Sequence, residues 1–240
     1  MNVIKAQDYA HMSTLASDLI IEEIEKSAYF KLGLATGSSP VGLYKELIEA
    51  YKKGTLSFEN VTSFNLDEYV GLKSDDPNSY HYFMQQHLFN HVNIQKHKTF
   101  IPNGMANDLQ EECRRYEALI EEEKGIDLQI LGIGENGHIG FNEPSTPFTE
   151  KTHVVSLDES TREANARFFN SKENVPTQAI TVGIHTIMKS KKILLLISGE
   201  SKKEAYERLM DPHISTYFPA SILHEHPDCT VIVDTETVMG

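Results

Sequence analysis

Cysteine and tryptophan are scarce in this 240-residue sequence, and long apolar runs are missing. There are two cysteines and no tryptophan. Cys113 and Cys229 lie far apart and fit no metal-ligand spacing, so we expect free thiols in a reducing compartment. No stretch approaches the roughly 18 apolar residues of a membrane span, and the first residues lack the basic and apolar regions of a secretory signal. These absences favour a cytoplasmic protein without a membrane partner.

Positive charge is also in short supply, since 22 lysines and arginines stand against 35 aspartates and glutamates, for a net charge of −13 at pH 7. This balance argues against a nucleic-acid partner, because non-specific binders rely on lysine and arginine at phosphates. A small phosphorylated substrate stays possible, since a few convergent basic groups can bind one phosphate on an acidic protein. Nothing in the middle of the chain resembles a flexible linker, so we expect residues 1–240 to form one domain.

Apolar runs suited to buried strands alternate with helical patterns along the chain. The expected strands are residues 29–35, 61–66, 128–133, 193–197 and 230–233. The expected helices include residues 12–25, 41–51, 79–91, 107–123 and 202–210. This alternation predicts an α/β fold with a mostly parallel sheet and helices on both faces. Ligands of such sheets bind beyond the carboxyl ends of the strands, so the segments after the strands are the candidates for chemistry.

The segment after the first expected strand is rich in glycine and hydroxyl groups: Thr36, Gly37, Ser38 and Ser39. Pro40 would stand in the first turn of the next helix, and a serine could cap that helix. Glycine lets the backbone approach an anion, and the helix N-terminus supplies free N–H groups. The pattern fits a phosphate cradle and an ordinary capped turn equally well.

Two carboxylates, Asp67 and Glu68, close the second expected strand. A carboxylate at this edge of the sheet could take a proton from a carbon next to a carbonyl or imine. For an isolated Asp-Glu pair, helix capping or solvation is the alternative interpretation.

The segment of residues 131–144 is the most informative one. Its glycines, which include Gly134, allow close backbone approach, and Glu143 follows His138 by five residues on what should be an irregular loop. Glu143 could therefore orient the imidazole and favour its protonated form, so that His138 shuttles protons near neutral pH. The same glycines read G-x-G-x-x-G, but a dinucleotide site is disfavoured because His138 stands where an uninterrupted helix should begin.

Three cations are candidate phosphate clamps: Arg162, Arg167 and Lys202. Arginine matches phosphate with a fork of donors, whereas lysine acts as a point charge. The remaining histidines have no carboxylate or cysteine at zinc-binding spacing, so we expect no metal site.

Together these motifs resemble glucosamine-6-phosphate deaminases over the whole chain. The similar segments are residues 34–40, 64–69, 134–144 and 178–183, and the string G-H-I-x-F-N-E-P, which begins at Gly137, is the most specific. The resemblance implies a Rossmann-like α/β fold and an aldose-to-ketose isomerisation coupled to loss of ammonia, without metal or organic cofactor.

The resemblance also implies roles for individual residues. Asp67 would move the C2 proton toward C1, and His138 would open the sugar ring. Glu143 would orient and charge-tune His138, with Asn136 in the same relay. Residues 36–39, Arg167 and Lys202 would hold the phosphate, Gly134 would lie at the substrate, and residues 162–170 would belong to a mobile lid.

Two departures from the family pattern matter. Some members carry aspartate where this chain has Asn136, so we expect a different pH profile, because asparagine cannot take up charge. Residues 150–155 hold little to match the basic residues with which allosteric members bind N-acetylglucosamine 6-phosphate between subunits, and the sequence stops shortly after the last expected strand. We therefore expect a non-allosteric monomer or weak homo-oligomer.

Two other functions compete with this interpretation. A 6-phosphogluconolactonase shares the phosphate loop and a G-x-x-G-H segment, but it hydrolyses an ester and needs no base placed like Asp67. A sugar-phosphate sensor would have kept the fold and lost catalysis. The presence of Asp67, His138 and Glu143 together favours the deaminase.

Overall fold

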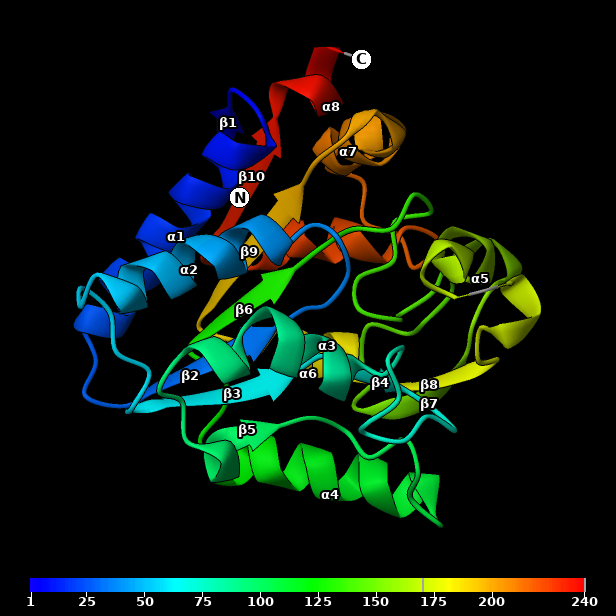
Figure 1. The fold of residues 1–240 in the computed structure, drawn as a ribbon. Coiled ribbons are helices and arrows are strands. Elements are labelled where there is room, and N and C mark those ends of the chain that lie inside the picture. The colour runs from blue at the N-terminus through cyan, green and yellow to red at the C-terminus, as the bar shows by residue number, and fades with distance from the viewer. Residues whose placement is uncertain (170, 240) are drawn as a thin grey trace.

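The structure is a computed structural model that describes residues 1–169 and 171–239. Its centre is a parallel sheet of seven strands (Figure 1). In spatial order the strands are β1 (Asn2–Ala6), β10 (Cys229–Asp234), β9 (Lys192–Ile197), β6 (Leu128–Leu131), β2 (Phe30–Leu34), β3 (Val61–Asn65) and β5 (Thr99–Phe100).

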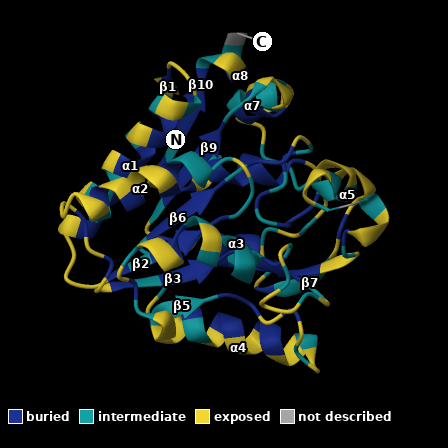
Figure 2. Ribbon diagram, in the orientation of Figure 1, coloured by how far each residue is buried: buried dark blue, intermediate teal, exposed yellow. Residues whose placement is uncertain are grey.

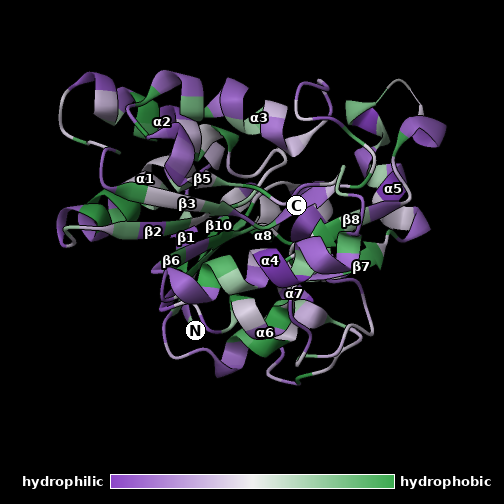
Figure 3. Cartoon of the chain, turned by 90° about the horizontal axis from the view of Figure 1, so that it is seen from below, coloured by the Kyte–Doolittle hydropathy of each residue, from purple (hydrophilic) through white to green (hydrophobic). Residues whose placement is uncertain are grey.

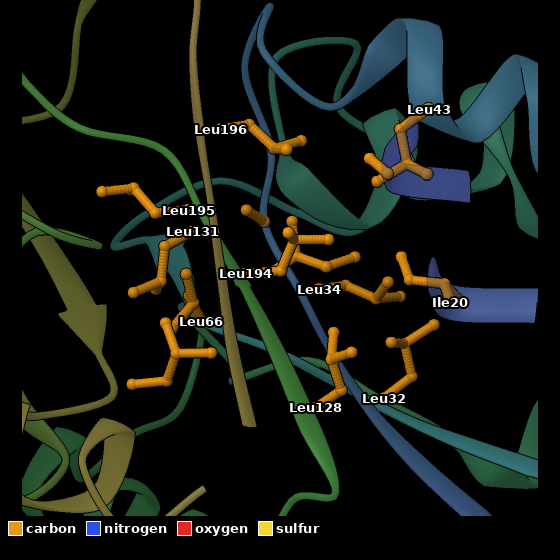
Figure 4. Packing of buried hydrophobic residues seen from close by; sticks show 14 of the residues in the cluster. Ile20, Leu32, Leu34, Leu43, Leu66, Leu128, Leu131, Leu194, Leu195 and Leu196 are labelled. Carbon is orange, nitrogen blue, oxygen red and sulfur yellow. The ribbon is translucent and has the colours of Figure 1, made fainter. Parts of the chain in front are cut away.

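The central strands are apolar at consecutive positions because both faces of the sheet are covered. In β9, Leu194 and Leu196 point toward α1 and α2, whereas Leu195 points to the opposite side with Leu131 and Leu66 (Figure 4). All five leucines are at most 2% exposed. β6 and most of β2 and β9 are therefore buried, and exposed residues are concentrated on the helices and loops (Figure 2).

Helices cover the two faces of this sheet in two groups. On one face lie α1 (Tyr9–Glu25), α2 (Val41–Lys52) and α3 (Tyr80–His87), and on the other lie α4 (Leu109–Glu122), α6 (Ile184–Ile187) and α7 (Lys203–Met210) (Figure 3). Chain order explains the division. Strands β1, β2, β3 and β5 follow one another in one direction across the sheet, and β6, β9 and β10 follow in the opposite direction, so right-handed crossovers place their helices on opposite faces.

Several helix starts are fixed by side-chain caps. Asp8 accepts the amide of His11 at 2.8 Å, Ser79 accepts that of Tyr82 at 3.1 Å, and Asp108 accepts that of Glu111 at 2.9 Å. The remaining helices are α5 (Glu159–Asn165), α8 (Thr235–Met239) and six short 3-10 helices, Phe89–His91, Lys96–Lys98, Ala166–Phe168, Lys172–Asn174, Glu200–Lys202 and Pro219–Glu225.

A smaller antiparallel sheet was not predicted. It consists of β4 (Asp67–Tyr69), β8 (Gln178–Thr181) and β7 (His153–Ser156), and it lies with α5 on the side to which the carboxyl ends of β3 and β6 point (Figure 1). Asp67 and Glu68 therefore belong to a strand of their own and do not simply end β3. The chain leaves the parallel sheet at Leu66, whose amide still bonds to the carbonyl of Leu34 at 3.0 Å.

The direction in which successive strands are added across the sheet reverses between β2 and β6, although the two strands are parallel. These strands are neighbours, yet β2 continues toward β3 and β6 continues toward β9. Such a switch point leaves a crevice at the carboxyl ends, where the loops after the two strands diverge. The α/β fold with a mostly parallel sheet and helices on both faces is thus confirmed. Among the described residues, no helix is both long and apolar enough to cross a bilayer.

Candidate active site

A cavity of about 140 Å³ lies at this switch point. It is bounded by the loops that follow β2, β6 and β9, by the start of β4, and by the segment after α5. Of the predicted site residues, those that line it are Thr36, Gly37, Ser38, Ser39, Asp67, Gly134, His138, Arg167 and Lys202. Asn136 and Glu143 lie behind His138. A cavity of about 640 Å³ shares five lining residues with it, Gly37, Ser38, Ser39, Tyr80 and Asn165.

The loop after β2 is shaped by a glycine and by a tyrosine from another helix. Gly37 has a φ of 89°, a left-handed backbone conformation that residues with a Cβ rarely adopt. The Tyr9 hydroxyl donates to the carbonyl of Ser38 at 2.8 Å, and it accepts the amide of Gly42 at 2.7 Å. The prediction of a serine cap is wrong, because Pro40 occupies the N-cap position without a side-chain bond. The serine hydroxyls are consequently not used to cap α2.

Two cations converge on this loop. Arg167 Nη2 donates to Ser38 Oγ at 3.4 Å, and the Arg167 guanidinium lies over the ring of Phe168. Burial lowers the pKa of Lys202, Glu135 raises it, and the neighbouring Arg167 charge lowers it further. Lys202 ends the Glu200–Lys202 turn and is the N-cap of α7, whereas the sequence predicted it as the first residue of that helix. Two mutually repelling cations beside a glycine and hydroxyl loop favour an anion between them.

The two adjacent carboxylates have separate surroundings. Asp67 lines the cavity and is 6% exposed. Burial, with a smaller contribution from the charge of Glu68, raises the pKa of Asp67 to about 8. Glu68 points elsewhere and binds backbone amides at the start of α3. Capping, which was the alternative for the pair, thus applies to Glu68, and Asp67 is placed to exchange protons near neutral pH.

His138 is backed by a carboxylate and an amide. Its Nδ1 lies 3.4 Å from Glu143 Oε2, and Asn136 Nδ2 donates to the same oxygen at 3.0 Å. Asn136 Oδ1 accepts the amide of His138 at 3.1 Å. Burial would raise the pKa of Glu143, but His138 and Asn136 bring it below its ordinary value. A buried, ionised carboxylate behind Nδ1 leaves Nε2 for proton exchange.

The glycines of this loop serve the protein's own side chains. A Cβ on Gly134 would lie 2.2 Å from Cε1 of His138, so the imidazole packs flat against this backbone. A Cβ on Gly137 would meet the ring of Phe218 at 2.1 Å, and the φ of Gly137 is 86°. At these two positions the absence of a Cβ thus leaves room for the rings of His138 and Phe218, and Gly134 also lines the cavity.

Arg162 does not reach the cavity. Its Nη2 donates to the carbonyls of Lys172 and Val175, both at 3.1 Å, and so ties together the segment after α5. The proposed lid falls on α5 and the Ala166–Phe168 turn, and Asn170 at its end lies outside the described residues.

Sequence reasoning missed Tyr80 and Asn165, which also line the cavity. Tyr80 is the first residue of α3, and nothing in the pattern of that helix indicated that β4 folds back beside it. No group of three or more histidines, cysteines or acids that could hold a metal occurs among residues 1–169 and 171–239.

Comparison with known proteins fits this geometry. The model of a family described as glucosamine-6-phosphate isomerases/6-phosphogluconolactonase matches residues 6–232. The chain belongs to this family. A member from Shouchella clausii named glucosamine-6-phosphate deaminase is 56% identical over 236 residues, which cover 98% of this chain and 96% of that protein. The resemblance of the sequence motifs to this family is thereby confirmed.

Two solved structures of the family place the fold. One is described as a monomeric glucosamine-6-phosphate deaminase; it is 51% identical, and the match covers 100% of this chain and 99% of that one with a TM-score of 0.99. A 6-phosphogluconolactonase from Trypanosoma brucei has a TM-score of 0.78 at 16% identity over 99% of this chain and 97% of its own. The second likeness concerns the fold alone.

Proposed function

We propose that this protein is an enzyme that converts glucosamine 6-phosphate and water into fructose 6-phosphate and ammonia. The observation that carries the proposal is that one cavity joins Asp67 and His138 to an anion site made by the loop after β2, Arg167 and Lys202. Relatives that are 51–56% identical over nearly the whole chain and are named glucosamine-6-phosphate deaminase support the same reaction.

The phosphate binds at residues 36–39, with Arg167 and Lys202 as its charged partners. A phosphate dianion offsets the repulsion between these two cations, so its binding is favourable. Because the phosphate is remote from the reacting carbons, its binding energy serves to position the flexible open-chain sugar. Gly134 keeps the His138 ring against the cavity wall.

Ring opening and proton transfer are separate tasks for two side chains. His138 moves a proton from the O1 hydroxyl to the ring oxygen, so the C1–O5 bond breaks and an aldehyde forms. Glu143 stabilises the imidazolium, and Asn136 holds Glu143 in place. Asp67 takes the proton from C2, which the aldehyde has made acidic, and returns it to C1. The substrate ammonium gives up one proton and O1 gains one, so that C1 becomes an alcohol and C2 an imine. Water then adds to the imine carbon at C2, and ammonia leaves.

The decisive experiment measures ammonia and fructose 6-phosphate from glucosamine 6-phosphate in metal-free buffer. Equal amounts of both products are expected for the parent. Losses of at least about 100-fold in kcat are expected for Asp67→Asn and His138→Gln. Exposed Asp18→Asn and His97→Gln are matched controls that keep parental rates. Saturable substrate binding without product would support the sensor instead, and hydrolysis of a sugar lactone alone would support the lactonase.

We further propose that residues 1–240 act as one domain, as a monomer, in the cytoplasm. The related structure described as monomeric supports the oligomeric state. Two buried free thiols, Cys113 and Cys229, support a reducing compartment. Sedimentation at about 1 to 100 μM, roughly the range in which weak dimers form, tests the oligomeric state. A dimer in this range would contradict the monomer.

A further inference from the structure

A second buried carboxylate stands directly behind Asp67. Successive residues of a strand point to opposite sides, and the two acids of β4 follow this rule. Asp67 lines the catalytic cavity. Glu68 instead faces a separate surface cavity of about 600 Å³, which His81, Lys73 and Asp75 also line. Strand β4 thus separates the reacting site from Glu68 and its partly exposed neighbour His81 on the other side.

The Glu68 carboxylate, 1% exposed, is fully engaged at the start of α3. Its Oε1 accepts the amides of Tyr69 at 2.8 Å and Tyr80 at 2.9 Å. Its Oε2 accepts the amide of His81 at 3.0 Å and lies 2.9 Å from His81 Nδ1. The first amides of a helix lack partners within the helix, so an anion there stabilises it. Glu68 therefore fastens α3 to β4.

This fastening determines the wall of the catalytic cavity. Tyr80, whose amide Glu68 binds, lines the cavity together with Asp67. Its ring also stacks on Phe141 with centroids 6.1 Å apart. A shift of α3 relative to β4 would consequently move Tyr80 away from the carboxylate that we assign as the base.

The charges around the two acids are unequal. On the side of Asp67, the facing titratable groups are four phenols and three groups of the cavity: Tyr44, Tyr69, Tyr80, Tyr116, His138, Arg167 and Lys202. On the side of Glu68, they are His81, Lys73 and Asp75. The His81 side chain is 33% exposed and is in direct contact with Glu68, so its proton can exchange with solvent.

We propose that Glu68 and His81 form a positioning pair for Asp67: Glu68 holds α3 and places negative charge behind the base, and the His81 imidazole, whose Nδ1 lies 2.9 Å from Glu68 Oε2, offsets that charge. The inference rests on the proposed function of Asp67. Neither residue touches the substrate, and both act through Asp67 and Tyr80.

The test is the pH dependence of kcat/KM for glucosamine 6-phosphate, which reports the free enzyme and substrate. The substrate is the same throughout, so differences between variants belong to the protein. Glu68→Gln removes the negative charge behind Asp67, and the acid limb of the kcat/KM profile should move to lower pH by about one unit. His81→Gln removes the imidazole that offsets the Glu68 charge, and the acid limb should move to higher pH by about half a unit. His81→Lys keeps a positive charge, so its limb should lie at or below that of the parent.

Opposite behaviour of His81→Gln and His81→Lys is the discriminating result, because a structural contact alone would be lost in both. Equal shifts in these two variants, or no shift in either, would overturn the proposal, even if Glu68→Gln fails to fold. Titration of the Asp67 carboxyl carbon by NMR in the same variants needs no activity. Opposite shifts there in a chain that releases no ammonia would reject the proposed function and keep the inference.

Discussion

Asp67 is held where its charge is unfavourable. Burial and Glu68 raise the pKa of this carboxyl to about 8, whereas its ordinary value is 3.8. The folded chain therefore binds the proton more tightly than the unfolded chain does. The stability that this proton contributes is fully present below pH 4 and is lost as the pH rises toward 8.

Because asparagine does not ionise, Asp67→Asn should remove the loss of folding stability that accompanies a rise in pH. We expect its free energy of unfolding to exceed that of the parent by about 1–3 kcal/mol at pH 8, with a much smaller difference at about pH 4. Urea unfolding at the two pH values measures both differences, and exposed Asp18→Asn is the control. A difference that does not depend on pH would show that the effect is not ionisation of Asp67.

Asn136 determines the charge of the relay behind His138. Its amide donates to Glu143 Oε2 at 3.0 Å, so Asn136→Asp would place a second carboxylate against a buried one. The added negative charge favours protonated His138. The limb of the pH–rate profile that reports this histidine should then move to higher pH by about one unit. Asn107→Asp adds the same charge at an exposed position, and a profile of Asn136→Asp that matches the parent would refute the role.

At the scale of elements, one hydroxyl of α1 joins the loop after β2 to α2. Tyr9 binds the carbonyls of Ser38 and Ser39 and the amide of Gly42, and so keeps these carbonyls turned away from a bound anion. Tyr9→Phe should weaken inhibition by inorganic phosphate about threefold to tenfold, the value of one lost hydrogen bond, with little change in kcat.

Inhibition constants for phosphate in the parent, Tyr9→Phe and exposed Tyr217→Phe measure this effect. Unchanged phosphate inhibition in Tyr9→Phe would mean that the loop keeps its shape without the hydroxyl. A fall in kcat at constant affinity would place Tyr9 with the chemistry and not with phosphate binding.

How far an element could be predicted depended on how it is buried. Strands such as β9 are continuous apolar runs, because both faces are covered, and these were predicted. β4 consists of Asp67, Glu68 and Tyr69, and β5 of two residues, so neither shows the pattern of a strand. β7 is mostly half-buried, and its pairing with β8 depends on contacts distant in sequence.

The same reasoning applies to the candidate site. The sequence indicated Asp67, His138 and Glu143 because the motifs place them beyond the carboxyl ends of expected strands. It could not reveal that Tyr80 and Asn165 share the cavity or that Glu68 binds His81, since these contacts arise where separate elements pack together.

For the whole molecule, the distribution of the core predicts cooperative unfolding. One cluster of buried side chains includes residues from every strand of the large sheet except β5, and a smaller cluster around Tyr69 and Phe141 joins β4, β7 and β8. The small sheet is continuous with the large one through Leu66, whose carbonyl accepts the amide of Val182 at 2.7 Å.

We therefore expect a single urea transition, with far-ultraviolet circular dichroism and tyrosine fluorescence coinciding. The tyrosine signal includes Tyr69 and Tyr80 of the smaller cluster, so separate unfolding of that part would shift the two curves apart. Two resolved transitions would contradict a single domain.

The neighbours of β1 also affect the time course of folding during synthesis. Among residues 1–169 and 171–239, β1 pairs only with β10 in the large sheet, so that Asn2 lies opposite Thr230. At about 5–20 residues per second, β10 leaves the ribosome roughly 10 to 45 s after β1. Throughout that interval β1 lacks its partner, and its backbone groups are open to other chains or to chaperones. The nascent chain must therefore remain protected until β10 emerges and the sheet can close at this edge.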